Sequence, residues 1–152
     1  MLDLSDVALR LGAATAIGIL IGLNRDLADK PIGMRTLSLV TLGAASAAVT
    51  AVQVPGMDQN PDAMSRVVQG VIQGVMAGIS FIGAGVILRN AEARTVEGLT
   101  TAASVWVAAA LGIACGLGMW NVVTIGAALA VVLLLAARVA ELIGVKKKQS
   151  GQ

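Results

Sequence analysis

The sequence predicts an all-α membrane protein, a bundle of five transmembrane helices, on three observations. Five long apolar runs occupy most of the 152 residues, 57% of the residues are hydrophobic and only 13% are charged. At about 1.5 Å per helical residue, each run crosses or nearly crosses a hydrocarbon core of about 30 Å. Backbone polar groups in lipid must be satisfied within the segment, so such runs form helices. The runs are Val7–Leu23, Leu37–Val54, Val67–Leu88, Leu99–Leu117 and Val122–Ala137.

The composition limits the chemistry that the chain can carry. Histidine is absent, which excludes histidine metal ligands and histidine proton relays. The single cysteine, Cys115, cannot form an internal disulfide and is expected to be a small buried hydrophobe. The sequence has no P-loop, no zinc-ligand spacing and no nucleophile with a histidine partner. We therefore expect a protein that is not an enzyme and that carries no cofactor or metal.

The domain organisation is simple. Residues 1–145 are expected to form the five-span membrane domain, and residues 146–152 a basic cytoplasmic tail. The chain begins with Asp3 and Asp6 where a signal peptide would have a basic region, so the first run is expected to be a retained span.

Basic residues are distributed unequally between the two sides of the predicted bundle. Alternate loops collect nine Lys and Arg residues on one side and two on the other. Because short loops rich in Lys and Arg stay in the cytoplasm, we expect the N-terminus outside and the C-terminus in the cytoplasm. The Lys146–Lys148 run is interpreted as an anchor to anionic lipid rather than as a nucleic-acid site. The nine are Arg25, Lys30, Arg35, Arg89, Arg94, Arg138, Lys146, Lys147 and Lys148, and the two are Arg10 and Arg66.

The first two spans carry local signals for a close contact and for a helix start. Gly18 and Gly22 in the first span have the spacing of a close helix–helix contact. Pro31 and Gly33 break the chain before the second span, which Thr36 is expected to cap.

A series of glycines marks the third span as the expected centre of the bundle. Small residues let helices approach closely in lipid, where van der Waals packing drives association. We interpret this face as packing within the chain, with a homodimer contact as the alternative. The fourth span carries two more glycines at the same spacing, and the fifth is the most lipid-like. The expected packing residues are Gly70, Gly74, Gly78, Gly83, Gly85, Gly112 and Gly116.

A polar stripe on the third span is one candidate functional feature. Its residues fall within about 60° of one another at about 100° per residue. Polar groups inside a span are costly, so the stripe either hydrogen-bonds neighbouring helices or lines a path for a ligand or ion. No carboxylate lies within a span from Leu37 to Ala137, although a magnesium or proton path normally has one. The stripe consists of Arg66, Gln69, Gln73 and Ser80.

The second candidate feature is a cluster of polar residues at the cytoplasmic helix ends. The N-termini of the second and fourth helices point there, and their dipoles favour anions. The charges either form an ion-pair network that fixes the helix ends or bind a phosphate-bearing or cationic ligand. The hydroxyls of the fourth helix are expected to bond their own helix carbonyls. The cluster consists of Arg25, Asp26, Arg35, Thr36, Glu97, Thr100 and Thr101.

Four stretches taken together resemble the MgtC/SapB family of bacterial inner-membrane proteins, from about residue 8 to residue 140. The resemblance implies a multi-pass protein of the bacterial inner membrane, in the short form without a cytoplasmic C-terminal domain. It also implies roles in low-magnesium growth, intracellular survival and restraint of the F-type ATP synthase. The stretches are Gly22–Asp26, Gly33–Leu37, Gly78–Ile87 and Val96–Trp106.

Two positions depart from the family pattern. Asn24 stands where the family usually has Glu, and Glu97 where it often has Arg. An acid is lost at one helix end and gained at another on the same side, which indicates that both positions belong to one electrostatic cluster.

These observations favour a non-enzymatic membrane protein that regulates or binds other membrane proteins. The expected partners are the lipid bilayer and other inner-membrane proteins, with the ATP synthase implied by resemblance, and a homo-oligomer is an alternative; nucleic acid is not expected. A small ion or solute transporter or channel that uses the polar stripe is the second hypothesis. A lipid or phosphate binder at the cytoplasmic cluster is the third.

Overall fold

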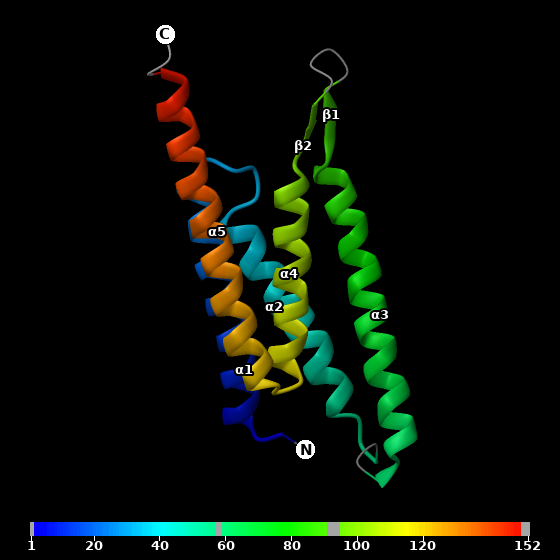
Figure 1. Ribbon diagram of the computed structural model, residues 1–152. Coiled ribbons are helices and arrows are strands. Elements are labelled where there is room, and N and C mark those ends of the chain that lie inside the picture. Colours follow the sequence, from blue (N-terminus) through cyan, green and yellow to red (C-terminus); the bar gives the residue numbers. More distant parts are fainter. Residues whose placement is uncertain (1, 57–58, 91–94, 150–152) are drawn as a thin grey trace.

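Five helices long and apolar enough to cross a membrane dominate the computed structural model (Figure 1), which describes residues 2–56, 59–90 and 95–149. This confirms the predicted helices. A short antiparallel hairpin stands where the sequence indicated only a charged loop, and in it Arg89 pairs with Val96. In chain order the elements are α1 (Leu4–Asp26), α2 (Met34–Val52), α3 (Pro61–Val86), β1 (Leu88–Asn90), β2 (Thr95–Glu97), α4 (Leu99–Gly116) and α5 (Trp120–Gln149).

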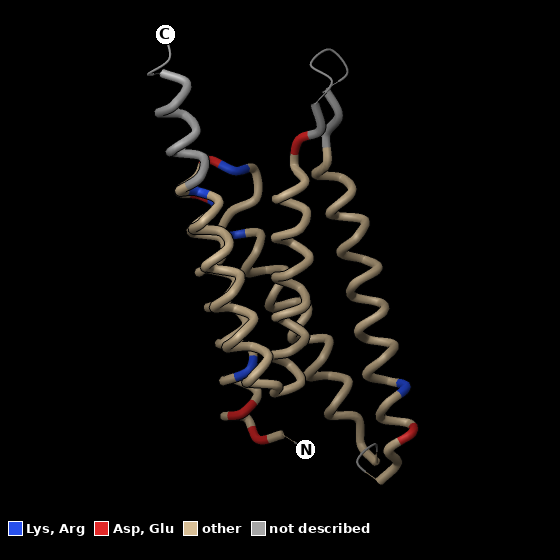
Figure 2. Tube along the Cα trace, in the orientation of Figure 1, with Lys and Arg blue, Asp and Glu red and all other residues tan. Residues whose placement is uncertain are grey.

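The charged residues of the described chain gather at the two ends of the helices and leave an uncharged layer between them (Figure 2). Helix α1 begins at the opposite end of the bundle from the last turns of α5, as an odd number of spans requires (Figure 1). We call the end that holds residues 25–36 and the hairpin the basic end. Arg94 and residues 150–152 of the expected tail lie outside the described residues.

Helix α3 and helix α4 begin with recognisable local chemistry. The side-chain Oδ1 of Asn60 accepts a hydrogen bond of 3.1 Å from the backbone N–H of Ala63, and Pro61 occupies the first turn, where no N–H is needed. Gly98 precedes α4 with φ 84°, and a Cβ there would lie 2.2 Å from the carbonyl oxygen of Val86. Only glycine fits this position between the hairpin and α4.

Helix α4, not α3, lies at the centre of the bundle. It contacts all four other helices, and eleven of its 18 residues are buried. In α3 the only buried residue is Gly83. The prediction that the third span is central was therefore wrong. The reason is that its glycine face points away from the other helices: a Cβ on Gly70, Gly74, Gly78 or Gly85 would meet nothing within 4 Å.

The close packing is made by glycines of α4 and α1 instead. A Cβ on Gly112 would lie 2.5 Å from the carbonyl oxygen of Thr41, and one on Gly116 would lie 2.5 Å from that of Ala45. On α1, a Cβ on Gly18 would lie 2.5 Å from a backbone atom of α2. The predicted packing roles of Gly112 and Gly116 are thus confirmed. Gly83 makes an ordinary contact, with its Cβ position 3.6 Å from Ala102.

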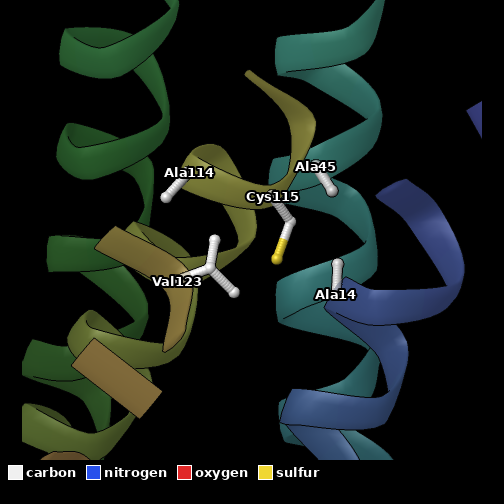
Figure 3. Packing of buried hydrophobic residues seen from close by; sticks show 5 residues of the cluster. All are labelled: Ala14, Ala45, Ala114, Cys115 and Val123. Atoms are coloured by element: carbon white, nitrogen blue, oxygen red, sulfur yellow. The ribbon is translucent and has the colours of Figure 1, made fainter. Parts of the chain in front are cut away.

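One core cluster illustrates how small side chains hold the helices together (Figure 3). Its members come from α1, α2, α4 and α5, and Cys115 is fully buried among them, as predicted. Small side chains bring backbones close enough for extensive dispersion contacts, which replace the hydrophobic effect inside lipid. The cluster consists of Ala14, Ala45, Ala114, Cys115 and Val123.

Candidate functional site

Arg25 and Thr101 form the centre of the site at the basic end. Arg25 lies in the last turn of α1 and Thr101 in the first turn of α4, and their side chains are 3% and 2% exposed. The Nη2 of Arg25 donates a hydrogen bond to the Oγ1 of Thr101. A buried guanidinium is costly unless it is hydrogen-bonded, so this contact fixes the end of α1 against the start of α4.

Asp26 acts on the start of α2. Its Oδ2 accepts a hydrogen bond of 2.9 Å from the backbone N–H of Met34, the first residue of that helix. A carboxylate at a helix N-terminus satisfies an otherwise unpaired donor and interacts favourably with the helix dipole. Thr36 lies inside the helix and is exposed, so the prediction that it caps α2 was wrong.

The remaining members of the predicted cluster divide between two places at the basic end. Thr100 lines a cavity together with Arg25, whereas Arg35 and Thr36 line a separate hollow together with Asp26. Arg35, Thr36, Glu97 and Thr100 are all exposed. Within the described residues no ion pair joins Arg35 to Glu97, so the predicted pairing of these two is not found. Glu97 is the last residue of the hairpin, which leads into α4, whereas Arg35 lies in the first turn of α2.

A cavity of about 270 Å³ adjoins the buried pair. It lies between α1, α4 and α5 at the basic end. Arg25, Lys30 and Arg138 line it together with apolar side chains and three uncharged polar residues, Asn24, Thr100 and Ser104. In the sequence, Lys30 and Arg138 indicated only the orientation of the chain, and their convergence with Arg25 was not predicted. One feature of the sequence pointed to it. Arg138 directly follows the last apolar run, Val122–Ala137, and therefore lies at the same end of the bundle as Arg25 and Lys30.

The polar stripe lies on the outside of the bundle. Arg66, Gln69, Gln73 and Ser80 are all exposed, and a shallow groove beside the two amides is lined by α3 residues alone. The Oγ of Ser80 donates a hydrogen bond of 2.8 Å to the carbonyl oxygen of Met76 in its own helix. In one copy of the chain the stripe therefore lines no path between helices, and a transport path along it would need a second chain.

The sequence is similar to several known proteins. The chain is 39% identical to SrpB of Synechococcus elongatus over 82% of this chain and 70% of that protein. It is 38% identical to SapB of Bacillus subtilis over 76% of this chain and 50% of that protein. It is 39% identical to MgtC of Salmonella typhimurium over 74% of this chain and 44% of that protein.

The match therefore spans half or less of the length of SapB and MgtC. No solved structure matches the chain. The MgtC family matches residues 11–143, which include all five spanning segments apart from the first turns of α1. The chain is a multi-pass membrane protein and belongs to the MgtC family.

Proposed function

We propose that this protein is a non-enzymatic regulator of the bacterial inner membrane, which binds another membrane protein through the outward face of α3. We define this outward face as residues 66, 69, 70, 73, 74, 77, 80 and 81. The observation that carries the proposal is a spanning helix that presents polar groups, glycines and an aromatic ring to its surroundings rather than to its own bundle.

The side-chain amides of Gln69 and Gln73 require hydrogen-bond partners that this chain does not supply to them in its described part. Gln69 and Gln73 are exposed within a segment apolar enough to span the membrane, and neither side chain is hydrogen-bonded within the described part of the chain. An amide that faces hydrocarbon lacks the partners that water would supply. A neighbouring helix with a polar side chain supplies them, at a gain of about 1 kcal/mol for each bond.

The shape of the face suits a helix as the partner. Gly70 and Gly74 leave open space above the α3 backbone, so a second helix can approach closely. Phe81 lies near the basic end of the face with 84% of its surface exposed, which makes it the anchor that a partner would cover.

Family membership supplies the physiological hypothesis. The resemblance implies factors for low-magnesium growth and intracellular survival that restrain the F-type ATP synthase, and we propose a membrane subunit of that enzyme as the first partner to test. A second copy of this chain is the competing partner. The alternative function, transport along the polar stripe, also requires a second copy, because only then does the stripe lie between two chains.

A photocrosslinking experiment tests the proposal in intact membranes. A benzophenone amino acid is placed at position 81, and the matched control carries it at Leu39, which is 64% exposed on α2. We expect position 81 alone to crosslink to another inner-membrane protein, and Gly74→Leu to abolish the product. Gly43→Leu is the control substitution, since Gly43 is equally open but lies on α2. A product that contains only this chain, or none at all, would overturn the proposal.

A further inference from the structure

The cavity at the basic end has apolar walls at membrane depth. It is bounded by α1, α4 and α5, and most of its lining belongs to the apolar stretches of these helices. Its volume of about 270 Å³ is near the lower limit of ordinary ligand sites, roughly 300 Å³. The space therefore suits a small headgroup with the upper part of one chain rather than a whole lipid. The apolar wall is formed by Ala103, Val107, Ala130, Leu133 and Leu134.

Basic side chains line one end of the cavity. Arg25, Lys30 and Arg138 come from three different parts of the chain and line the same space, and none of the described lining residues is a carboxylate. Guanidinium and ammonium groups bind phosphate oxygens in proteins through charge-assisted hydrogen bonds. The donors that line the cavity thus suit an anionic ligand.

The basic side chains are held in place by contacts already present. Arg138 Nη2 donates a hydrogen bond of 3.1 Å to the carbonyl oxygen of Leu27, which joins the end of the α5 span to the end of α1. One bond occupies one of the five N–H donors of a guanidinium. Arg25 is fixed against Thr101. Side chains fixed in this way lose little conformational freedom when an anion binds.

The cavity opens toward the lipid. Val107 and Leu133 in its wall are 37% and 69% exposed, on spanning parts of α4 and α5. A ligand can therefore enter sideways from the hydrocarbon. A free phosphate would gain nothing from the apolar wall, whereas an amphiphile uses both the wall and the basic end.

We propose that this cavity binds an anionic phospholipid, with the phosphate between Lys30, Arg138 and Arg25 and one acyl chain along the wall formed by α4 and α5. The site is separate from the outward face of α3. Loss of lipid binding and loss of partner binding are therefore distinguishable.

Native mass spectrometry of the detergent-purified chain tests the proposal by titration with phosphatidylglycerol or with phosphatidylcholine of the same acyl chains. We expect phosphatidylglycerol to bind at least about tenfold more tightly, the effect of one charge-assisted contact. Inorganic phosphate at millimolar concentration should neither bind nor displace the lipid. Equal affinity for the two lipids overturns the proposal, and so does phosphate that displaces phosphatidylglycerol, since the ligand would then be a free anion.

Three substitutions locate the site. Arg138→Gln should lower the affinity for phosphatidylglycerol about tenfold and reduce its preference over phosphatidylcholine. Ala103→Phe, which fills the apolar wall, should weaken both lipids. Arg35→Gln is the matched control, because Arg35 carries the same charge at the same end but lies outside the cavity.

Melting in detergent shows whether each variant is folded. If Arg138→Gln fails to fold, Lys30→Gln on the α1–α2 loop replaces it, with the same expected loss. If the cavity variants lower the affinity for phosphatidylglycerol no more than Arg35→Gln does, the lipid binds elsewhere and the proposal is overturned.

Discussion

Arg10 in α1 donates a hydrogen bond of 2.8 Å from Nη1 to the carbonyl oxygen of Gly116, the last residue of α4. The same guanidinium forms an ion pair with Asp6, with 3.0 Å between Nη2 and Oδ2. A cation at a helix C-terminus satisfies a carbonyl that has no partner within its helix and interacts favourably with the helix dipole. Arg10 therefore fixes the far end of the central helix to α1, whereas Arg25 fixes its start.

Replacement of Arg10 is expected to destabilise the protein. Arg10→Met should lower the free energy of unfolding by about 1–3 kcal/mol, because the Gly116 carbonyl loses a charged donor in a partly buried place. Thermal melting in mild detergent measures the change. Arg66→Met is the control, since Arg66 is exposed on α3, and it should shift the melting temperature little. Equal shifts for the two variants would show that the Arg10 contact contributes nothing.

Arg25 and Thr101 are expected to be energetically coupled. Thr101→Val keeps the shape of the side chain and removes the hydroxyl that accepts from Arg25, and Arg25→Met removes the donor. A double-mutant cycle should give a coupling of about 0.5–3 kcal/mol. The same cycle on Arg35→Gln and Glu97→Gln should give a value near zero, because these two residues are exposed and form no ion pair in the described structure. A larger coupling energy for Arg35 and Glu97 than for Arg25 and Thr101 would contradict the contacts described at the basic end.

Glycines of α4 and α3 are expected to respond oppositely to a methyl group. Gly112→Ala places a Cβ 2.5 Å from a backbone oxygen of α2 and should cost about 1–3 kcal/mol through overpacking. Gly74→Ala meets nothing within 4 Å and should leave the stability of the isolated chain unchanged or slightly increased. Unfolding in detergent compares the two. A large loss for Gly74→Ala would mean that α3 packs inside the bundle after all.

The orientation of the chain in the membrane is expected to follow its basic residues. A phosphatase that is active only after export should be inactive when fused to the C-terminus and active in the external loop near residue 56, because nine of eleven Lys and Arg residues lie on the C-terminal side. Enzymatic activity of the fusions in intact cells measures this. An active C-terminal fusion would reverse the orientation.

The sequence alone determined the class and the number of spans. The apolar runs and the scarcity of charge sufficed, because the bilayer imposes helix length and internal hydrogen bonding on any chain that crosses it. It also indicated the close packing of Gly18, Gly112 and Gly116 and the core position of Cys115. These features depend on local composition and spacing, which a single sequence displays directly.

Only the tertiary structure decided which face meets which neighbour. Glycines at a spacing of four have the same sequence pattern whether they pack inside the bundle, as on α4, or face outward, as on α3. The hydrogen bonds from Arg10 to Gly116 and from Arg25 to Thr101 join residues 106 and 76 positions apart, a relationship that no local spacing reveals. The cavity at the basic end likewise exists only after α5 has folded back beside α1, because spatial proximity between distant segments is set by packing and not by sequence order.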